Sequence, residues 1–317
     1  MRVSVIIPTW NQRNLLLDCL ESLEEQTFRD AEITVVDDAS PDDTADIVAA
    51  RYPAARLIRQ AENQGFCAAV NAGIRASTGN LVLLLNDDMT LAPDFLERLV
   101  HAAEASGAAM FAPLILWRDE AQTIYGAGDR QRANGRPESI GFRRPLQGFA
   151  FSSEVFGVCA GAALYRREVF ERAGLFDPAF NIYFSDSDLS FRARLGGFGA
   201  RFVREAVAYH VGSAGLFGRT LKRTRQCYVN HMVLVVKDMP AGLLLRHGPA
   251  IAAERLHQAR RVFSAARTDG GAVYAGRVLF GAWCSMLRLL PHAWRERRRI
   301  QRARTVSLDA LEAVLTR

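Results

Sequence analysis

The chain has 317 residues, 49% of them apolar and 23% charged, which fits a large globular domain with an appendage and excludes wholesale disorder. Its five cysteines are widely spaced and form no C-x-x-C pair, so they indicate neither a zinc site nor a disulfide framework, and a reducing compartment fits best. Charge is uneven, because residues 240–317 hold 14 Arg against 5 Asp or Glu, a balance of +9 in a chain whose total is +6. Such a tail indicates a polyanionic partner, either a membrane surface or nucleic acid.

Strands and helices are expected to alternate through the first 90 residues. Short apolar segments predict strands at 3–7, 32–36, 56–58 and 81–85, and helical spacing predicts helices at 15–26, 44–51 and 66–76. This alternation is typical of a parallel sheet with helices on both faces. A first strand that begins at Val3 leaves no room for a signal peptide, and no uninterrupted apolar run reaches the ~18 residues needed to cross a bilayer. We therefore expect a protein of the cytosolic side.

The regular pattern loosens after a predicted helix at 95–105 and a strand at 110–117. Residues 118–150 are rich in Gly, Arg, Asn and Pro and predict a long irregular loop, a kind of segment that usually serves as a lid or binding loop. Regular structure is expected again at 161–166, 167–173, 189–195 and 201–210, and only helices are expected beyond residue 222.

Two adjacent carboxylates, Asp87 and Asp88, directly follow the apolar run Leu81–Leu85. A short run of this kind predicts a strand buried on both faces, and ligands of open α/β sheets bind just beyond the carboxyl ends of such strands. Two carboxylates at one place repel each other unless a cation lies near them. Mg²⁺ takes one or two protein carboxylates together with phosphate oxygens, so the pair favours a metal–phosphate site. The alternative is a polar turn before the helix that follows Pro93.

Polar clusters recur where predicted strands end, at residues 8–11, 37–38, 86–88 and 185–188. A single cluster is more often a turn or a helix N-cap, but repetition along one sheet edge indicates a shared site. The G-x-G-x-x-G motif of dinucleotide-binding proteins is missing after the first strand, and no G-x-x-x-x-G-K-[ST] loop occurs. Phosphates would therefore be bound through a metal rather than a glycine-rich loop.

Several longer motifs belong to these strand ends. They are Val-Ser-Val-Ile-Ile-Pro-Thr-Trp-Asn at 3–11, Val-Val-Asp-Asp-Ala-Ser at 35–40, Asn-Gln-Gly-Phe at 63–66 with Asn71, Leu-Leu-Asn-Asp-Asp at 84–88, Gly161 with Arg-Arg-Glu-Val-Phe at 166–170, and Phe176-Asp177 with Tyr-Phe-Ser-Asp-Ser-Asp-Leu at 183–189. In order and spacing this set resembles family 2 glycosyltransferases, above all the bacterial branch that includes rhamnosyl- and galactofuranosyltransferases. The resemblance covers roughly residues 1–240.

The resemblance implies a GT-A fold, an α/β domain with a mixed, mostly parallel sheet over residues 1–215. Residues 1–110 would bind the nucleotide sugar, residues 111–215 would bind the acceptor, and residues 216–317 would form a basic helical region. The residues implied to bind the nucleotide are Pro8, Thr9, Trp10, Asn11, Asp38, Gly65, Asn71, Asn86 and Asp87. Asp38 would accept a hydrogen bond from N3–H of uracil or thymine.

The resemblance also implies the residues of the chemical step. Asp186 would be the catalytic base that deprotonates the acceptor hydroxyl. Asp88 and His210 would bind Mn²⁺ or Mg²⁺, although His210, met in an unknown fold, would first be interpreted as a half-buried structural histidine. Gly161 and Asp188 would contact the donor or acceptor sugar.

The implied function is inverting, metal-dependent transfer from dTDP-rhamnose or a UDP-sugar to a hydroxyl of a lipid-linked or growing cell-surface polysaccharide. One position departs from the family pattern, because Ser185 stands where a Glu is usual. That departure keeps a catalytically inert binding or scaffold subunit open as an alternative. A sugar nucleotidyltransferase is a second alternative, but it would need a Gly-rich basic loop after the first strand. Processive synthesis is not expected, since the Gln-x-x-Arg-Trp signature is absent.

The tail has its own pattern. Apolar residues surround most of a predicted helix at 272–291, while Arg277, Arg288 and Arg295 fall within about 20° of one another at 100° per residue. This arrangement predicts peripheral contact with an anionic membrane, and truncation near residue 240 would then give a more soluble protein. The alternative is a helix that packs on the catalytic domain and completes its core. Nucleic-acid binding is disfavoured, because no aromatic residues alternate with the arginines.

Overall fold

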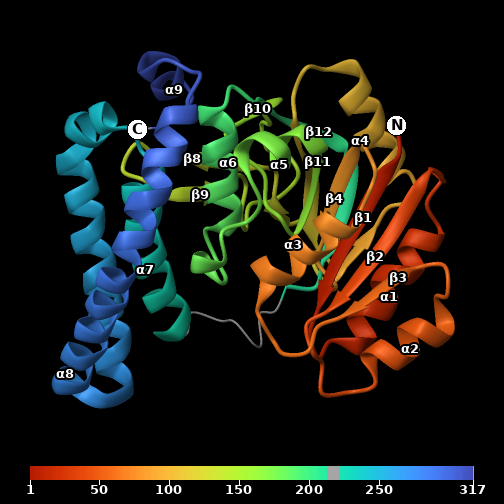
Figure 1. Ribbon diagram of the computed structural model, residues 1–317, viewed down its shortest axis with the longest axis horizontal. Coiled ribbons are helices and arrows are strands. Elements are labelled where there is room, and N and C mark those ends of the chain that lie inside the picture. The colour runs from red at the N-terminus through yellow and green to blue at the C-terminus, as the bar shows by residue number, and fades with distance from the viewer. Residues whose placement is uncertain (213–220, 317) are drawn as a thin grey trace.

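A ten-stranded sheet forms the centre of the molecule, with helices on both of its faces (Figure 1). The structure is a computed structural model that describes residues 1–212 and 221–316. The strand order is β10-β12-β6-β11-β4-β1-β2-β3, with β5 beside β12 and β7 beside β6. The strands of this sheet are β1 (Val3–Thr9), β2 (Ala31–Asp37), β3 (Arg56–Arg59), β4 (Leu81–Leu85), β5 (Met89–Leu91), β6 (Met110–Trp117), β7 (Ile124–Gly126), β10 (Glu154–Val155), β11 (Ala162–Arg166) and β12 (Ala200–His210).

The parallel part of the sheet is the part that the sequence predicts. Strands β3, β2, β1 and β4 pair in parallel, so their carboxyl ends meet at one edge. Strand β11 lies antiparallel between β4 and β6, and β12 runs parallel to β6. The sheet is therefore mixed and mostly parallel in its first half, which confirms the predicted α/β class.

The central strands are buried on both faces because their apolar side chains alternate between two cores. Val3, Val5 and Ile7 face a core that contains side chains of α1, α2 and α4, whereas Ile6 faces a core that contains side chains of α3, α5 and α6. The helices are α1 (Arg13–Glu24), α2 (Thr44–Arg51), α3 (Phe66–Ala76), α4 (Phe95–Ala105), α5 (Arg167–Ala173), the 3₁₀ turn η1 (Pro178–Phe180) and α6 (Ser185–Leu195). Burial on both faces explains why β4 is an uninterrupted apolar run.

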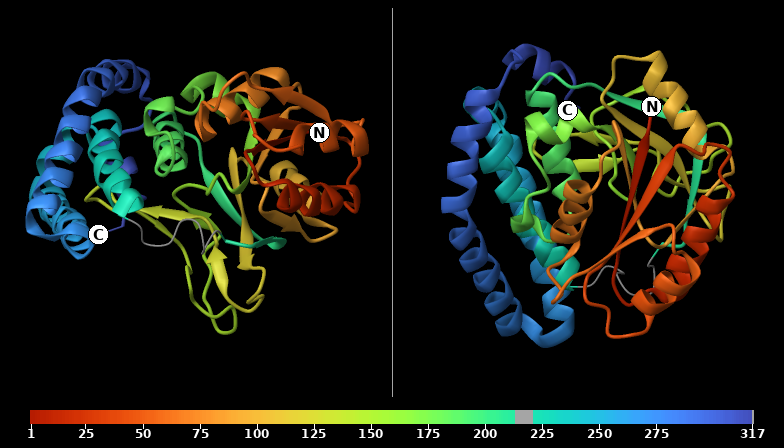
Figure 2. Two further views of the ribbon diagram at one scale, coloured as in Figure 1. Left: turned by 90° about the horizontal axis from the view of Figure 1, so that it is seen from below. Right: turned by 45° about the vertical axis from the view of Figure 1, so that its right-hand side comes forward.

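The prediction of an irregular loop at 118–150 is partly wrong. Strand β7 pairs with β6 in the main sheet, and β8 (Asp129–Gln131) pairs with β9 (Pro137–Ser139) in a separate two-stranded sheet. These strands are only three residues long, and such short strands gain their pairing from neighbours rather than from an alternating pattern of their own. The segment projects beside the sheet in the left view of Figure 2.

The tail forms three helices, α7 (Leu221–Asp238), α8 (Ala241–Ala303) and α9 (Leu308–Ala313). Helix α8 folds back on itself where Gly270 and Gly271 leave the helical conformation, and its two halves lie beside α7 in Figure 1. Gly271 has a φ of 77°, a left-handed conformation that glycine adopts without strain. The start of the tail lies partly outside the described residues, because 216–220 are not described.

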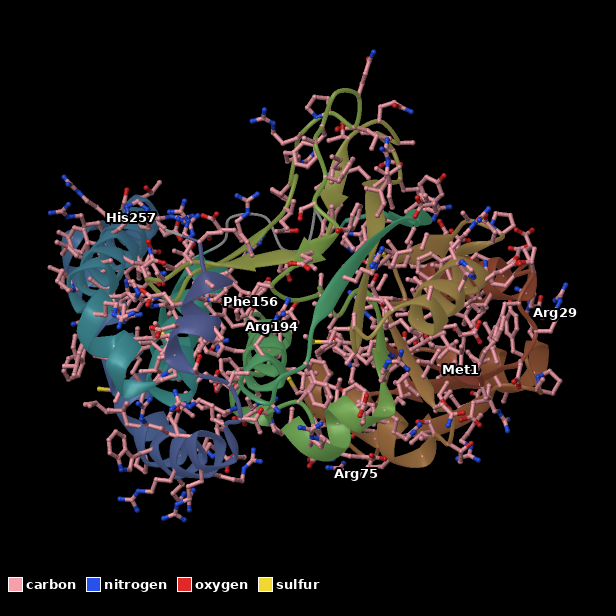
Figure 3. All side chains as sticks on the ribbon, turned by 90° about the horizontal axis from the view of Figure 1, so that it is seen from above. Met1, Arg29, Arg75, Phe156, Arg194 and His257 are labelled. Atoms are coloured by element: carbon pink, nitrogen blue, oxygen red, sulfur yellow. The ribbon has the colours of Figure 1, made fainter. Side chains whose placement is uncertain are left out.

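The tail packs on the sheet domain through a core of its own. Phe180, Phe191 and Leu195 of the sheet domain share this core with apolar residues of α7, α8 and α9, and Phe156 and Arg194 lie at the same junction (Figure 3). The apolar tail residues in it are Val233, Leu234, Val235, Met239, Leu243, Ile251, Ala293, Ile300 and Leu311. The predicted boundary after residue 215 therefore separates two parts that share one core. The tail thus packs on the sheet domain, as the alternative to membrane contact predicts.

Helix α8 is also long and apolar enough to cross a membrane. An 18-residue stretch of this helix has a mean hydropathy of 1.2 and at most two charged residues, and 17% of the stretch is buried. The stretch is not an uninterrupted apolar run, which is why the sequence did not predict a membrane span here. By length and composition alone, α8 is the one described helix that could cross a membrane.

Candidate functional site

Asp38 lies buried just beyond the end of β2, at the edge where the parallel strands end. Its backbone N–H donates to the carbonyl of Thr9 at 2.9 Å, which ties this strand end to that of β1. The carboxylate accepts the backbone N–H groups of Gln64 at 2.9 Å and Gly65 at 2.8 Å. A carboxylate has about four lone-pair positions, so it can accept a further hydrogen bond from a ligand.

Trp10 forms an exposed wall beside Asp38, with 51% of its surface accessible. The side-chain amide of Asn63 lies between the two residues and can bond to both of them in one of its two orientations. In that orientation its oxygen accepts from Trp10 Nε1 at 3.1 Å and its nitrogen donates to Asp38 Oδ2 at 3.3 Å. The adjacent Pro8 is half-buried and Thr9 is buried, whereas Asn11 is exposed and adopts a φ of 54°. The structure thus brings the four residues at 8–11 together with Asp38.

The backbone conformation at position 65 requires a glycine. Its φ is +85°, and a Cβ at this position would approach Asn181 Oδ1 to 2.6 Å. Any other residue would be strained and would push on the loop that leads to α6. Gly65 therefore contributes a backbone N–H to Asp38 and allows close contact between the start of α3 and Asn181, which lies in the loop between η1 and α6.

Asp88 lies against His210, a residue 122 positions later in the chain, with Asp88 Oδ2 and His210 Nε2 2.9 Å apart. Strand β5 brings them together, because it follows Asp88 directly and pairs its Met89 with His210 of β12. The backbone N–H of Val211 also donates to the carbonyl of Asp88 at 3.1 Å. The pairing of β5 with β12 therefore assembles a carboxylate and an imidazole at the end of β4.

This pair has unused ligand atoms. Asp88 Oδ1 and His210 Nδ1 are buried and lack a hydrogen-bond partner among the described residues. The neighbouring carboxyl of Asp87 has its pKa raised to about 7, chiefly by burial; the Thr9 hydroxyl lowers it and Asp88 raises it further. Within the described ranges, no group of three or more His, Cys, Asp or Glu is placed to hold a metal. The donor set is thus one carboxylate and one imidazole, which suits a divalent ion that takes further ligands from phosphate and water.

Two aromatic side chains lie beside His210, Trp117 at the end of β6 and Tyr125 of the 118–150 segment, and the sequence did not predict this contact. The ring centroids of Tyr125 and His210 are 4.2 Å apart, and Trp117 contacts both rings. The guanidinium of Arg143 lies 3.6 Å from the centroid of the Trp117 ring. The composition of this segment predicted a binding loop, and the structure places its Tyr125 beside the Asp88–His210 pair.

Asp186 lies in the first turn of α6, with Oδ1 accepting the Ser187 backbone N–H at 2.8 Å. Burial raises its pKa above the usual range, against the opposing effect of backbone N–H groups of Ser187 and Ala160. Asp129 of β8 lies near it, since burial and then the charge of Asp186 raise the pKa of Asp129. A high pKa suits a carboxylate that must remove a proton.

The residues around Asp88 and those around Asp186 lie near the same two side chains, Cys159 and Tyr125. Burial raises the pKa of the Cys159 thiol well above its usual range, and Asp186, Asp129 and Asp88 each raise it further. The pKa of Tyr125 is raised chiefly by burial, with contributions from both Asp88 and Asp186. Because the two carboxylates act on the same two side chains, the strand end that carries Asp88 and the start of α6 converge.

Gly161 and Asn86 join these two clusters. The backbone N–H of Asn86 donates to the carbonyl of Gly161 at 2.8 Å. A Cβ on Gly161 would lie 3.0 Å from Met89 Cε and 3.4 Å from Asn86 Nδ2. The glycine thus lets the Asn86 side chain lie close to the backbone; sugar contact at Gly161 and nucleotide contact at Asn86 stay predictions.

Two of the predicted site residues do not fit the structure. The Asn71 amide, 3% exposed, bonds both polar groups of the Phe176 backbone, at 2.8 and 3.0 Å, so it joins α3 to the segment before η1 rather than facing a nucleotide. Asp188 is fully buried and pairs with Arg192 at 2.7 Å and with Lys237 of α7 at 2.6 Å. Asp188 is two residues after Asp186 in α6, about 200° around the helix, so the two side chains lie on opposite sides of it. Sequence pattern alone does not distinguish these buried polar residues from ligand-binding ones.

Comparison with known proteins adds family evidence. The model of the family described as "Glycosyl transferase family 2" matches residues 4–174. The succinoglycan biosynthesis protein ExoO of Rhizobium meliloti is 37% identical over 107 residues, 33% of this chain and 31% of that protein. The uncharacterized glycosyltransferase EpsJ of Bacillus subtilis is 29% identical over 229 residues, 68% of this chain and 60% of that protein. The matches thus span less than two thirds of either relative.

Solved structures share the fold. The mannosyltransferase PcManGT from Pyrobaculum calidifontis, in complex with GDP-Man and Mn²⁺, superposes with a TM-score of 0.59 at 21% identity, over 95% of this chain and 85% of that one. GalNAc-T7 with UDP, GalNAc and Mn²⁺ gives a TM-score of 0.60 at 19% identity, over 75% of this chain and 48% of that one. At these identities the likeness shows the fold, and the predicted GT-A architecture is confirmed.

Proposed function

Because this chain belongs to glycosyl transferase family 2, we propose that it transfers a sugar from a nucleoside diphosphate sugar, dTDP-rhamnose or a UDP-sugar, to a hydroxyl of a lipid-linked or growing cell-surface polysaccharide. The observation that carries the proposal is the convergence of Asp88 and His210 with Asp186 at the end of the parallel strands. The similarity to ExoO, a succinoglycan biosynthesis protein, supports a polysaccharide as acceptor.

The nucleotide is expected to lie along the ends of β1 and β2. Asp38 is held by two backbone N–H groups and can accept the N3–H of uracil or thymine. The exposed indole of Trp10 offers a flat surface beside it, on which a base can stack. Asp87, with its raised pKa, lies between this base site and Asp88 and would face the ribose or the metal.

Asp88 and His210 would hold Mn²⁺ or Mg²⁺. They fit such an ion because Asp88 Oδ2 and His210 Nε2 lie 2.9 Å apart, and because Asp88 Oδ1 and His210 Nδ1 are buried without a hydrogen-bond partner among the described residues. The complexes of the two structural neighbours with Mn²⁺ support a divalent metal. When bound, the ion would supply a Lewis acid for the charge that develops on the leaving diphosphate.

Asp186 is the proposed catalytic base. It would accept the proton of the acceptor hydroxyl while that oxygen bonds to the anomeric carbon and the bond from this carbon to the diphosphate oxygen breaks. Attack from the face opposite the diphosphate inverts the anomeric centre. The Ser187 backbone N–H orients the Asp186 carboxylate by donating to its Oδ1.

The tail offers a surface for an anionic membrane. Large apolar side chains are exposed on the second half of α8 at helical spacing: Val273, Phe280, Trp283, Leu287 and Trp294. The exposed Arg277, Arg288 and Arg295 lie along the side of this stripe. Apolar and aromatic residues next to arginines are the pattern of a helix that lies in a membrane interface. We therefore expect a cytoplasmic protein that contacts the inner face of the cell membrane.

Nucleotide binding with and without metal tests the proposal. Calorimetry with UDP and dTDP should give much tighter binding in Mn²⁺ or Mg²⁺ than in EDTA, because a diphosphate without metal would meet the bare carboxylates of Asp87 and Asp88. Asp88→Ala should remove the metal effect. Release of UDP or dTDP from labelled sugar nucleotides then identifies the donor, and slow hydrolysis without acceptor separates an active transferase from an inert scaffold. Equal affinity in metal and in chelator would overturn the assignment.

A further inference from the structure

The loop that leads to Asp186 is strained. It connects η1 to α6, and three of its four residues have positive φ: Asn181 at 56°, Tyr183 at 65° and Phe184 at 68°. Non-glycine residues rarely adopt this conformation, and two of these residues are bulky aromatics. Such a conformation persists only where surrounding contacts hold it in place.

One tail residue provides those contacts. Asn230 of α7 is fully buried, and its Nδ2 donates to the carbonyls of Phe180 at 3.0 Å, Ile182 at 3.0 Å and Tyr183 at 2.8 Å. Its Oδ1 accepts from Gln226 Nε2 at 2.9 Å, one helical turn earlier. An amide nitrogen has two hydrogens, so all of its donor capacity is directed at this loop.

The loop sets where α6 begins. The carbonyl of Phe184, its last residue, accepts the backbone N–H of Asp188 at 2.8 Å, the first hydrogen bond of the helix. Asp186 lies in the turn closed by that bond. A shift of the loop would therefore move the Asp186 carboxylate relative to Asp88 and His210.

Helix α7 also holds the other side of α6. Lys237, two turns after Asn230, lies 2.6 Å from Asp188 and 2.5 Å from Asp177, and His292 of α8 reaches Asp177 at 2.9 Å. Lys237 thus ties α6 to the tail through Asp188, and the contacts of Asp177 tie the residue before η1 to it. The part between these two anchors includes the loop and the start of α6, which carries Asp186, and Asn230 is bonded to the carbonyls of that part.

We propose that Asn230 is a positioning residue that orients the Asp186 carboxylate by holding the carbonyls of residues 180, 182 and 183. The proposal rests on the role of Asp186 in the proposed function. It assigns a part in the reaction to a helix that lies outside the region matched by the family model.

The test uses the full-length protein, Mn²⁺ and UDP-glucose, UDP-galactose and dTDP-rhamnose, with the donor that the wild type hydrolyses fastest. Asn230→Ala should lower the rate of hydrolysis at saturating donor by roughly 10- to 100-fold, as a misplacement of about 1 Å does, while leaving the KM for the donor unchanged. Hydrogen exchange of the backbone amides at 181–187 should become faster. Asn230→Ser keeps one donor group and should recover part of the rate, and it serves as the test variant if Asn230→Ala does not fold.

Val229→Ala is the matched control. Val229 precedes Asn230 on α7 and is equally buried, but it packs against Val262 and Met286 of α8 rather than the loop. It should lower the thermal midpoint without changing the rate or the exchange of 181–187. Asp186→Asn separates the positioning role from the base assignment, because retained hydrolysis in that variant overturns the base assignment itself. If Asp186→Asn is inactive but both Asn230 variants lose no more rate than Val229→Ala, the positioning role is wrong.

Discussion

At the scale of single residues, the chemistry depends most on Asp186. Asp186→Asn replaces a carboxylate by an amide of nearly the same shape, which cannot accept the acceptor's proton. We expect transfer and donor hydrolysis to fall by roughly 100- to 10,000-fold, with nucleotide affinity unchanged. Initial rates and calorimetry on the same preparation measure both. A variant with near wild-type rate would move the base to another group. Asp129, whose pKa is raised by burial and then by the charge of Asp186, is the first to examine.

A second residue makes stability depend on pH. His231 of α7 is fully buried, with Nε2 3.0 Å from the carbonyl of Asn134, and burial followed by the charge of Arg255 lowers its pKa to about 4. An unfolded histidine titrates near 6.5, so between these values the unfolded state binds more protons than the folded state. The contribution of His231 to the free energy of unfolding is therefore fully present above about pH 6.5 and is lost as the pH falls toward about 4. This contribution is at most about 3 kcal/mol.

Urea unfolding at several pH values checks this effect. His231→Gln keeps a donor toward Asn134 but does not titrate, so its stability should change less between pH 7 and pH 4.5 than that of the wild type. Exposed His257 provides the control, since His257→Gln should leave the wild-type profile as it is. Parallel curves for the wild type and His231→Gln would show that another group causes the loss.

At the scale of elements, α8 is a part of the folded core. Met239, Leu243, Ile251, Ile300 and Leu311 of the tail are buried in the core shared with Phe180 and Phe191. Burial of each such side chain contributes roughly 1.5–3 kcal/mol, and the sum is comparable with the 5–15 kcal/mol that stabilise a typical domain. We expect a chain that ends at Asp238 to aggregate or to lose cooperative unfolding, instead of becoming more soluble.

Soluble yield and thermal unfolding of the truncated chain measure this. A shorter truncation after Ala303 removes only α9 and the residues beside it, including Thr316, whose backbone bonds Gln131 and Ala133. It should lower the thermal midpoint but keep cooperative unfolding. A soluble fragment that ends at Asp238 and binds nucleotide normally would show that the tail is dispensable for the fold.

At the scale of the whole molecule, the exposed stripe on α8 should bind anionic vesicles. Each basic residue near an anionic surface contributes on the order of 1 kcal/mol, and exposed charges are screened over about 8 Å at physiological ionic strength. Flotation with vesicles of phosphatidylglycerol and phosphatidylcholine should therefore carry the protein upward at low salt, less at high salt, and not with phosphatidylcholine alone.

Matched variants assign this binding to one face. Phe280→Ser and Trp283→Ser, which remove exposed apolar area from the second half of α8, should weaken flotation. Leu256→Ser changes an equally exposed residue of the first half, 53% accessible, and should have no effect. If the protein stays with the soluble fraction on anionic vesicles, or if the variants change only its oligomeric state, the stripe contacts protein rather than lipid.

The sequence by itself determined the class of fold and the sheet edge at which the candidate site lies. The apolar run followed directly by Asp87 and Asp88 predicts where these two carboxylates lie, because strand direction places the residues after β4 at the ligand-binding edge of the sheet. The same reasoning located the residues at 8–11 and Asp38, since each directly follows or ends a strand. These predictions need only positions that are neighbours in the chain.

Only the tertiary structure decided the contacts between distant segments. Asn71 and Asp188 resemble site residues by motif, but a buried backbone and a buried lysine take up their polar groups. No local pattern shows that Asn230 faces the loop before Asp186, or that the same helix α8 buries one side and exposes another. Periodicity predicts that a helix has an apolar face, whereas the partner that covers that face depends on the packing of elements far apart in sequence.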